Sequence, residues 1–125
     1  MKPKGKRSFI SSVKDCLNGF GYIVSNEHNF KREIALGVLA LLLAVILKVS
    51  KIEFIIVLIV IALVIVSEIF NTAIEKVVDL YTKDYNEIAR IAKDVSALAV
   101  LTMCIFALAI GGVIFIPKII EIIGR

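Results

Sequence analysis

The sequence contains only two cysteines and one histidine, and this scarcity excludes several kinds of site. Cys16 lies in a basic N-terminal region, whereas Cys104 lies in the middle of the longest apolar run. These two positions belong to different phases of a membrane, so we expect no disulfide. No cysteine or histidine pair has metal-ligand spacing. We interpret the single histidine, His28, as an interfacial polar residue rather than a ligand or a general base.

The common catalytic and nucleotide-binding motifs are also missing from the chain. There is no GxxxxGK[ST] sequence, which excludes a P-loop. Gly19-Phe20-Gly21 begins a GxGxx string, but Val24 takes the place of the third glycine. No strand is expected before it, so a dinucleotide fingerprint is excluded. No nucleophile elbow and no paired-histidine motif occur.

Charge is absent from three long stretches, namely residues 34–47, 54–67 and 95–117. The chain is 59% hydrophobic, whereas soluble domains are usually about 45–50% apolar. This segregation excludes a soluble globule, a disordered tail protein and a nucleic-acid binder. The basic start is not followed by an apolar segment until Ile34, which argues against a secretory signal. We expect one integral-membrane domain over residues 1–125.

The charge-free stretches predict an all-α fold with three membrane helices. Crossing about 30 Å of hydrocarbon takes about 20 residues, so the two 14-residue stretches must extend beyond their charge-free parts. The first can run on to Lys51, and the second must continue through Glu68. We therefore expect membrane helices over about residues 30–50, 53–80 and 93–117. Glu68 is then placed near the inner boundary of the hydrocarbon.

The positive charges predict the orientation of these helices. Residues 48–53 suffice only for a tight hairpin, and three crossings place the termini on opposite sides. One side collects residues 1–33 and 76–94 with eleven lysines and arginines, and the other collects four. Because basic residues concentrate on the cytoplasmic side, we expect the N-terminus in the cytoplasm and the C-terminus outside.

An amphipathic helix is predicted ahead of the first membrane helix, over residues 8–25. Its apolar residues recur at helical spacing, and its polar residues occupy the other side. Such a helix is typical of the cytoplasmic interface, next to anionic headgroups. The apolar set is Phe9, Ile10, Val13, Leu17, Phe20 and Val24.

The segment 67–80, SEIFNTAIEKVVDL, carries a polar stripe on one helix face. The stripe consists of Glu68, Asn71, Thr72, Glu75 and Asp79. Carboxylates crowded at membrane depth repel one another unless a proton or a cation intervenes. The stripe therefore indicates a wet cleft that binds a divalent metal. The alternative is that the helix leaves the membrane at Glu68 and the stripe is solvated.

Two short clusters flank this stripe on the same side of the membrane. Asn26-Glu27 precedes the first membrane helix, and Ala92-Lys93-Asp94 begins the third. Small residues after Asp94 permit close helix contact. Acidic metal ligands beside a lysine suit phosphoryl transfer, in which a carboxylate receives the proton of the acceptor hydroxyl.

These motifs resemble the prokaryotic diacylglycerol kinase/undecaprenol kinase family. The resemblance rests on the ExxNxAIExxxD string at residues 68–79, with Asn26-Glu27 before it and Ala92-Lys93-Asp94 after it, and covers about residues 19–117. It implies a small lipid kinase of the bacterial inner membrane, with a surface helix, three membrane helices and a cytoplasmic active site. It also implies a homotrimer with sites shared between subunits.

The resemblance further implies roles for individual residues. Glu68 would be the general base acting on the lipid hydroxyl, and Glu27 and Glu75 would hold Mg²⁺ on ATP. The residues expected to contact the nucleotide or position the reacting groups are Asn71, Lys93, Asp94 and the stretch Asp84-Tyr85-Asn86, whose residue types differ from the family's; Asp79 would support the site. Upstream of Gly19 the chain departs from diacylglycerol-type sequences, so no substrate contacts transfer there.

The acceptor lipid is a finer question. The His-Asn-Phe after Glu27, the KVSKIEF hairpin and the IPKII ending resemble Gram-positive members, which favours undecaprenol over diacylglycerol. Both lipids place a hydroxyl at the interface above an apolar tail, so the residues themselves leave both open. A function of another class, a non-enzymatic oligomeric pore, would need polar residues along the full depth of a helix. Residues 95–116 carry no charge.

Overall fold

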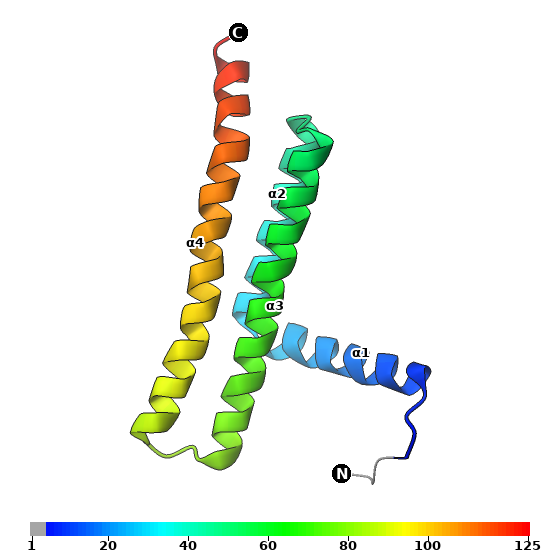
Figure 1. The fold of residues 1–125 in the computed structure, drawn as a ribbon, viewed down its shortest axis with the longest axis vertical. Helices are drawn as coiled ribbons and strands as arrows, with labels where there is room; N and C mark the ends of the chain where they lie inside the picture. Colours follow the sequence, from blue (N-terminus) through cyan, green and yellow to red (C-terminus); the bar gives the residue numbers. More distant parts are fainter. Residues whose placement is uncertain (1–4) are drawn as a thin grey trace.

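The computed structural model describes residues 5–125, which form four helices: α1 (Phe9–Asn26), α2 (His28–Ile46), α3 (Lys51–Tyr81) and α4 (Glu87–Ile123). α2, α3 and α4 stand upright as a bundle, and α1 extends sideways from its lower end (Figure 1). The expected all-α fold is confirmed in these residues. Lys2 and Lys4, which we counted toward the cytoplasmic side, lie outside the described residues.

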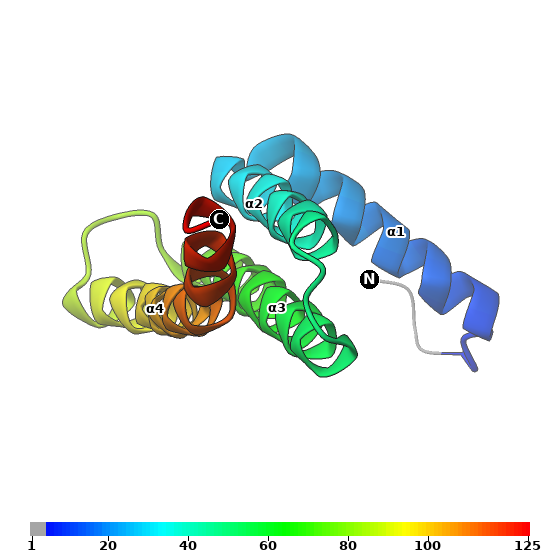
Figure 2. The ribbon, with the colours of Figure 1, turned by 90° about the horizontal axis from the view of Figure 1, so that it is seen from above.

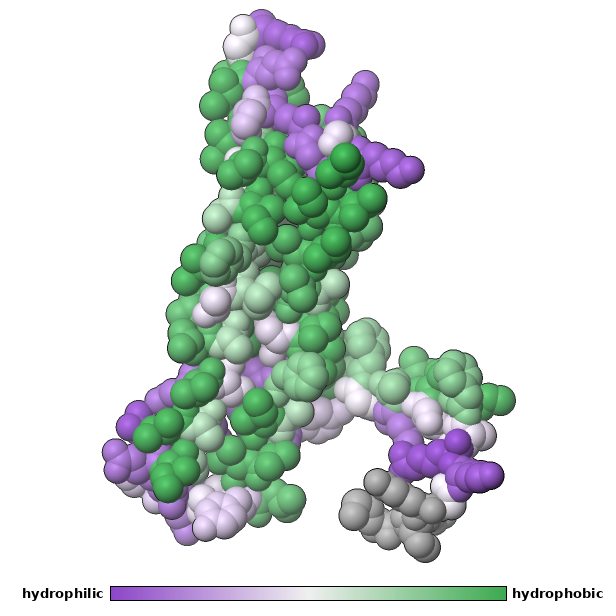
Figure 3. Space-filling model, in the orientation of Figure 1, coloured by the Kyte–Doolittle hydropathy of each residue, from purple (hydrophilic) through white to green (hydrophobic). Residues whose placement is uncertain are grey.

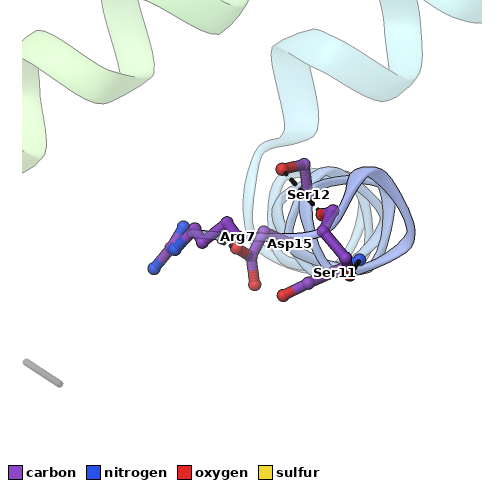
Figure 4. A network of polar contacts seen from close by, with 5 residues as sticks. Arg7, Ser11, Ser12 and Asp15 are labelled. Carbon is purple, nitrogen blue, oxygen red and sulfur yellow. Dashed lines mark hydrogen bonds and ion pairs between the residues drawn. The ribbon is translucent and has the colours of Figure 1, made fainter. Parts of the chain in front are cut away.

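α1 begins one residue later than predicted because Ser8 caps it. The Ser8 hydroxyl accepts a hydrogen bond from the Ser11 backbone N–H at 3.2 Å, as N-cap serines do. Arg7 pairs with Asp15 on the polar side at 2.7 Å, and Ser12 donates back to the Ser8 carbonyl (Figure 4). In Figure 3 the hydrophobic surface of α1 lies on the side of the bundle's apolar band, with hydrophilic residues opposite.

The turn between α2 and α3 differs from the sequence prediction. α2 ends at Ile46 and does not run on to Lys51, which instead begins α3. Lys48 adopts a left-handed conformation (φ 52°), and the Val49 N–H donates to the Ala44 carbonyl. Ser50 and Glu53 then form a capping box, each side chain accepting from the other's backbone N–H. This reciprocal cap starts α3 earlier than the expected residue 53.

α4 is longer than predicted at both ends. It begins at Glu87 rather than at about residue 93, because the Asn86 side chain caps it by accepting from the Ala89 N–H at 3.0 Å. It runs through Pro117 to Ile123. A proline removes one helical hydrogen bond, which apolar membrane helices tolerate. Just beyond it, Lys118 pairs with Glu53 at 3.4 Å and ties α4 to the start of α3.

Two of the helices, α3 and α4, are long and apolar enough to cross a membrane. Figure 3 shows the hydrophobic band over the bundle, with hydrophilic residues at its two ends. α2 does not meet the same test; its first turns carry Lys31, Arg32 and Glu33 ahead of the charge-free stretch. Most residues of the apolar windows of α3 and α4 are not buried within the chain, as is typical of helices that face lipid.

α3 is the central helix, since both α2 and α4 pack against it. Viewed from above, the three helices form a triangle, with α4 to the left of α3 and α2 above both (Figure 2). α2 approaches α3 closely at Gly37, where an added Cβ would lie 2.9 Å from Cγ2 of Ile61. Cγ2 is attached next to the α3 backbone and has little freedom to move. Gly37 therefore sets the distance between α2 and α3.

Gly37→Ala is expected to destabilise the bundle, because the new methyl group forces α2 and α3 apart. Overpacking of this kind typically costs about 1–3 kcal/mol. The measurement is the thermal unfolding midpoint in detergent. Gly111→Ala is the matched control, since its added Cβ would lie 3.8 Å from the nearest side-chain atom. Equal midpoints for the two variants would contradict the assigned role of Gly37.

Candidate active site

The corner between α1 and α2 places Glu27 at the lower end of the bundle. Glu27 is the one residue between the two helices, with extended backbone angles (φ −112°, ψ 107°). Its N–H still donates to the Ile23 carbonyl at 2.9 Å, which fixes the corner. Phe30, 1% exposed, packs edge-on against Phe20 across it, with ring centroids 6.2 Å apart. The half-buried Glu27 side chain is thereby held beside α3.

The polar stripe of α3 faces the inside of the bundle. Glu68 is 2% exposed, and Asn71 and Thr72 are also buried. This burial contradicts the alternative in which the helix has left the membrane at Glu68 and the stripe is solvated. Buried polar groups need partners, so the stripe must be satisfied by other side chains or by bound molecules.

Asn71 links α3 to α4 within this stripe. Its amide nitrogen donates to Glu75 Oε1 at 3.4 Å, and its amide oxygen accepts from the Ser96 hydroxyl at 2.8 Å. From the sequence we interpreted Ser96 only as a small residue that allows close packing. The structure shows that its hydroxyl orients Asn71, and through Asn71 the Glu75 carboxylate.

Three carboxyl groups gather around Glu68. Those of Glu27 and Glu75 lie close enough to act on it electrostatically, and that of Glu33 is its near neighbour. The sequence prediction missed Glu33. It is the last charge before the charge-free part of α2, and ionisable residues at such a position usually face a bundle interior. That position was the signal that could have identified it.

The turn between α3 and α4 forms a second, more hydrophilic part of the site. A pocket of about 210 Å³ brings together the expected residues Asp84, Tyr85, Asn86, Lys93 and Asp94. Tyr85 is 83% exposed, and the side-chain oxygen of Asn86 also caps α4. The pocket also includes Lys83 and Arg90, two cations that we had not singled out.

The lysine and the aspartate of the Ala92-Lys93-Asp94 motif have different partners. Lys93 Nζ contacts Asp79 Oδ1 at 2.6 Å. Because Asp79 lies one helical turn after Glu75 on α3, this ion pair joins Lys93 to the polar stripe. Asp94 pairs instead with Arg90 at 2.9 Å on the exposed side of α4. Within one chain, therefore, Lys93 is paired with the stripe of α3, whereas Asp94 is paired with a residue of its own helix.

The carboxylates of Glu27 and Glu75 are suited to bind a magnesium ion that also binds phosphate oxygens. Within residues 5–125, no three His, Cys, Asp or Glu side chains are grouped closely enough to hold a metal by themselves. Mg²⁺ usually binds one or two carboxylates together with water and substrate phosphates. Glu27 and Glu75, which both act electrostatically on Glu68, supply that number of carboxylates. The donor set fits a metal–nucleotide complex rather than a free-standing metal site.

Comparison with known proteins identifies the family. The sequence model of the prokaryotic diacylglycerol kinase family matches residues 14–115. The chain belongs to this family. It is 34% identical to a diacylglycerol kinase of Synechocystis over 92% of this chain and 66% of that protein. It is 32% identical to the undecaprenol kinase of Bacillus subtilis, covering 89% of this chain and 90% of the relative.

A diacylglycerol kinase of Haemophilus influenzae is also 32% identical, over 91% of this chain and 98% of its own length. These matches confirm the resemblance and the expected enzyme class, a lipid kinase. They imply ATP as the co-substrate and a lipid as the acceptor.

Ser96→Ala is expected to weaken this site, because it leaves the buried Asn71 oxygen without its donor. Losing such a bond costs about 1–3 kcal/mol of stability. We expect a lower unfolding midpoint and a several-fold lower kcat. Ser67→Ala is the control, since the Ser67 hydroxyl donates only to the Val64 carbonyl of its own helix. If both variants behaved alike, the Ser96–Asn71 bond would have no role in the site.

Proposed function

We propose that this protein uses Mg-ATP to phosphorylate a membrane lipid alcohol, with undecaprenol as the preferred acceptor and diacylglycerol as the alternative. The observation that carries the proposal is the burial of Glu68 between Glu27, Glu75 and Asn71. Membership in a family of lipid kinases supports the kinase over a non-enzymatic pore. The site lies where a charge-free stretch ends, so an interfacial hydroxyl and a soluble nucleotide can both reach it.

Glu68 acts in this proposal as the general base. Its carboxylate takes the proton of the lipid hydroxyl as the hydroxyl oxygen attacks the γ-phosphorus of ATP. The bond from the γ-phosphorus to its bridging oxygen breaks, and ADP leaves with that oxygen. Asn71 positions the reacting groups, since Ser96 and Glu75 fix its amide on both sides.

The nucleotide is held by charges from the corner and from the α3–α4 turn. Glu27 and Glu75 would bind Mg²⁺, which neutralises charge on the phosphates during transfer. Lys93, oriented by Asp79, contacts a phosphate. Asp84, Tyr85, Asn86 and Asp94 line the pocket in which the rest of the nucleotide binds.

The arrangement in the membrane is part of the same proposal. α2 is a third crossing together with α3 and α4, and the N-terminus, α1 and the site are cytoplasmic, with the C-terminus outside. The proposed assembly is a homotrimer with shared sites. It is supported by Ala97 and Ala99, small exposed residues of α4 that allow close approach of another copy.

Glu68→Gln is expected to abolish turnover without disturbing the fold, because glutamine keeps the shape of the side chain and cannot take the proton. We expect kcat to fall by roughly 100-fold or more, the usual contribution of a general base. Glu121→Gln, at the far end of α4, is the control. The measurement is phosphorylated lipid formed in detergent, together with the elution volume of the oligomer. Near-normal turnover of Glu68→Gln would contradict the role of Glu68 as the general base.

The acceptor is tested by incubating the purified protein with Mg-ATP and either undecaprenol or diacylglycerol at matched mole fractions. We expect a higher kcat/KM with undecaprenol, because the corner, hairpin and C-terminal motifs resemble undecaprenol kinases. A higher value with diacylglycerol would reverse the acceptor assignment. Formation of no product with either lipid would overturn the proposed function itself.

A further inference from the structure

Lys76 is a cation near the site to which the proposed function assigns no role. It follows Glu75 directly on α3, and its Nζ lies over the ring of Tyr22 in α1, 5.6 Å from the ring centroid. Tyr22 is 45% exposed, and Lys76 is also exposed. A cation–π contact at an exposed position is weak, so the ammonium group can leave the ring for a stronger partner.

The position of Lys76 on α3 places it beside the polar stripe, on the side of α1. At about 100° per residue, Lys76 lies about 80° around the helix from Glu68, and Asn71 lies about 60° in the other direction. Asn71 contacts Ser96 of α4, whereas Lys76 contacts α1. The stripe therefore has α4 on one side and Lys76 on the other.

The negative charges nearest to Lys76 belong to the site. Glu27 and Asp79 both lie close enough to act on it electrostatically. In the part of the chain that the structure describes, however, no carboxylate lies within ion-pair distance of Lys76. Asp79 pairs with Lys93 instead. The charge of Lys93 is thus already balanced by a carboxylate, whereas that of Lys76 is not.

We propose that Lys76 contacts the phosphates of the metal-bound nucleotide from the side of α1, and that Tyr22 is a positioning residue for its ammonium group. The inference rests on the proposed kinase function and concerns the nucleotide half of it. Phosphoryl transfer requires cations on the phosphate oxygens, and charged hydrogen bonds to phosphate are strong. Lys93 from α4 and Lys76 from the side of α1 then hold the phosphates from two directions.

Two other roles for Lys76 use similar chemistry. It could bind the headgroup phosphate of an anionic lipid, since α1 is expected at the membrane interface. It could also serve only to balance the charge of Glu27. The placement favours the nucleotide, because the groups that surround Lys76 are the proposed metal ligand Glu27 and the partner of Lys93, and neither is paired with it.

The first experiment removes the charge of Lys76 and then restores it. For Lys76→Met we expect the KM for ATP to rise by about tenfold, as when a charged hydrogen bond is lost, with the KM for the lipid acceptor unchanged. Lys76→Arg is expected to restore the KM for ATP. Lys14→Met is the matched control, since it removes a charge from the exposed surface of α1 and is expected to keep both values. The assay uses neutral detergent with and without added anionic lipid.

Tyr22 is tested in combination with Lys76. Tyr22→Leu is expected to raise the KM for ATP by about threefold, the effect of losing an exposed cation–π contact. In the Lys76→Met background, Tyr22→Leu is expected to cause no further rise, because its effect passes through the lysine. A further rise of the same size would contradict the positioning role.

The kinetic outcomes that would overturn the nucleotide contact are distinct. Equal KM values for ATP in Lys76→Met and Lys14→Met would exclude it. A higher acceptor KM, or a defect seen only with anionic lipid present, would assign Lys76 to a headgroup phosphate. A lower requirement for Mg²⁺ with an unchanged KM for ATP would mean that Lys76 only balances the charge of Glu27.

Lysine labelling separates this inference from the proposed function, because it needs no turnover. The unaltered protein in neutral detergent with Mg²⁺ is treated with an amine-acylating reagent, with and without ATP, and labelled peptides are measured by mass spectrometry. We expect ATP to slow labelling of Lys76 and to leave Lys14 unaffected. Protection of Lys76 without formation of phosphorylated lipid would overturn the kinase function and support the nucleotide contact. Turnover without protection would overturn the contact alone.

Discussion

A carboxylate held away from water at the end of a long apolar stretch is the constraint on which the rest of this molecule depends. Glu68 is 2% exposed and follows fourteen residues without a charge. An ionised group there is expensive unless polar partners or a cation compensate it. The corner at Glu27, the Ser96–Asn71–Glu75 chain of hydrogen bonds and the Asp79–Lys93 pair all lie at this end of the bundle. They supply the polar environment that an apolar bundle lacks.

The two ends of the bundle differ in whether their polar groups have hydrogen-bond partners. At the α2–α3 turn, a left-handed Lys48, the Ser50–Glu53 capping box and the Lys118–Glu53 pair close the structure locally. At the other end, Glu33 Oε2 and Thr72 Oγ1 are buried without partners among the described residues. A buried polar group without a partner calls for an explanation, such as a catalytic role or a bound water or ion. This contrast is why we place the chemistry at the end near Glu68.

Periodicity was sufficient to predict much of this arrangement from the sequence. The spacing of Glu68, Asn71 and Glu75 fixes them on one helix face, and the charge-free stretches fix which segments are apolar. The starts of α3 and α4 are set by the local caps at Ser50 and Asn86. Hydrophobic periodicity does not predict such caps, so the predicted starts were wrong. Glu33 and Ser96 were missed for another reason. Their roles arise from contacts between helices, with Glu68 and Asn71, that no spacing along one chain reveals.

The central claim is that the carboxylates around Glu68 divide their work between holding the metal–nucleotide complex and removing a proton. Binding of the metal–nucleotide complex can be measured separately from proton removal. Mn²⁺ replaces Mg²⁺, ATP is titrated into the membrane-embedded protein, and electron paramagnetic resonance reports the bound Mn²⁺. Glu75→Gln is predicted to weaken Mn–ATP binding by about tenfold, the loss of one charged ligand interaction. Glu68→Gln is predicted to bind Mn–ATP as the unaltered protein does. Equal weakening by the two variants, or no weakening by Glu75→Gln, would contradict the account.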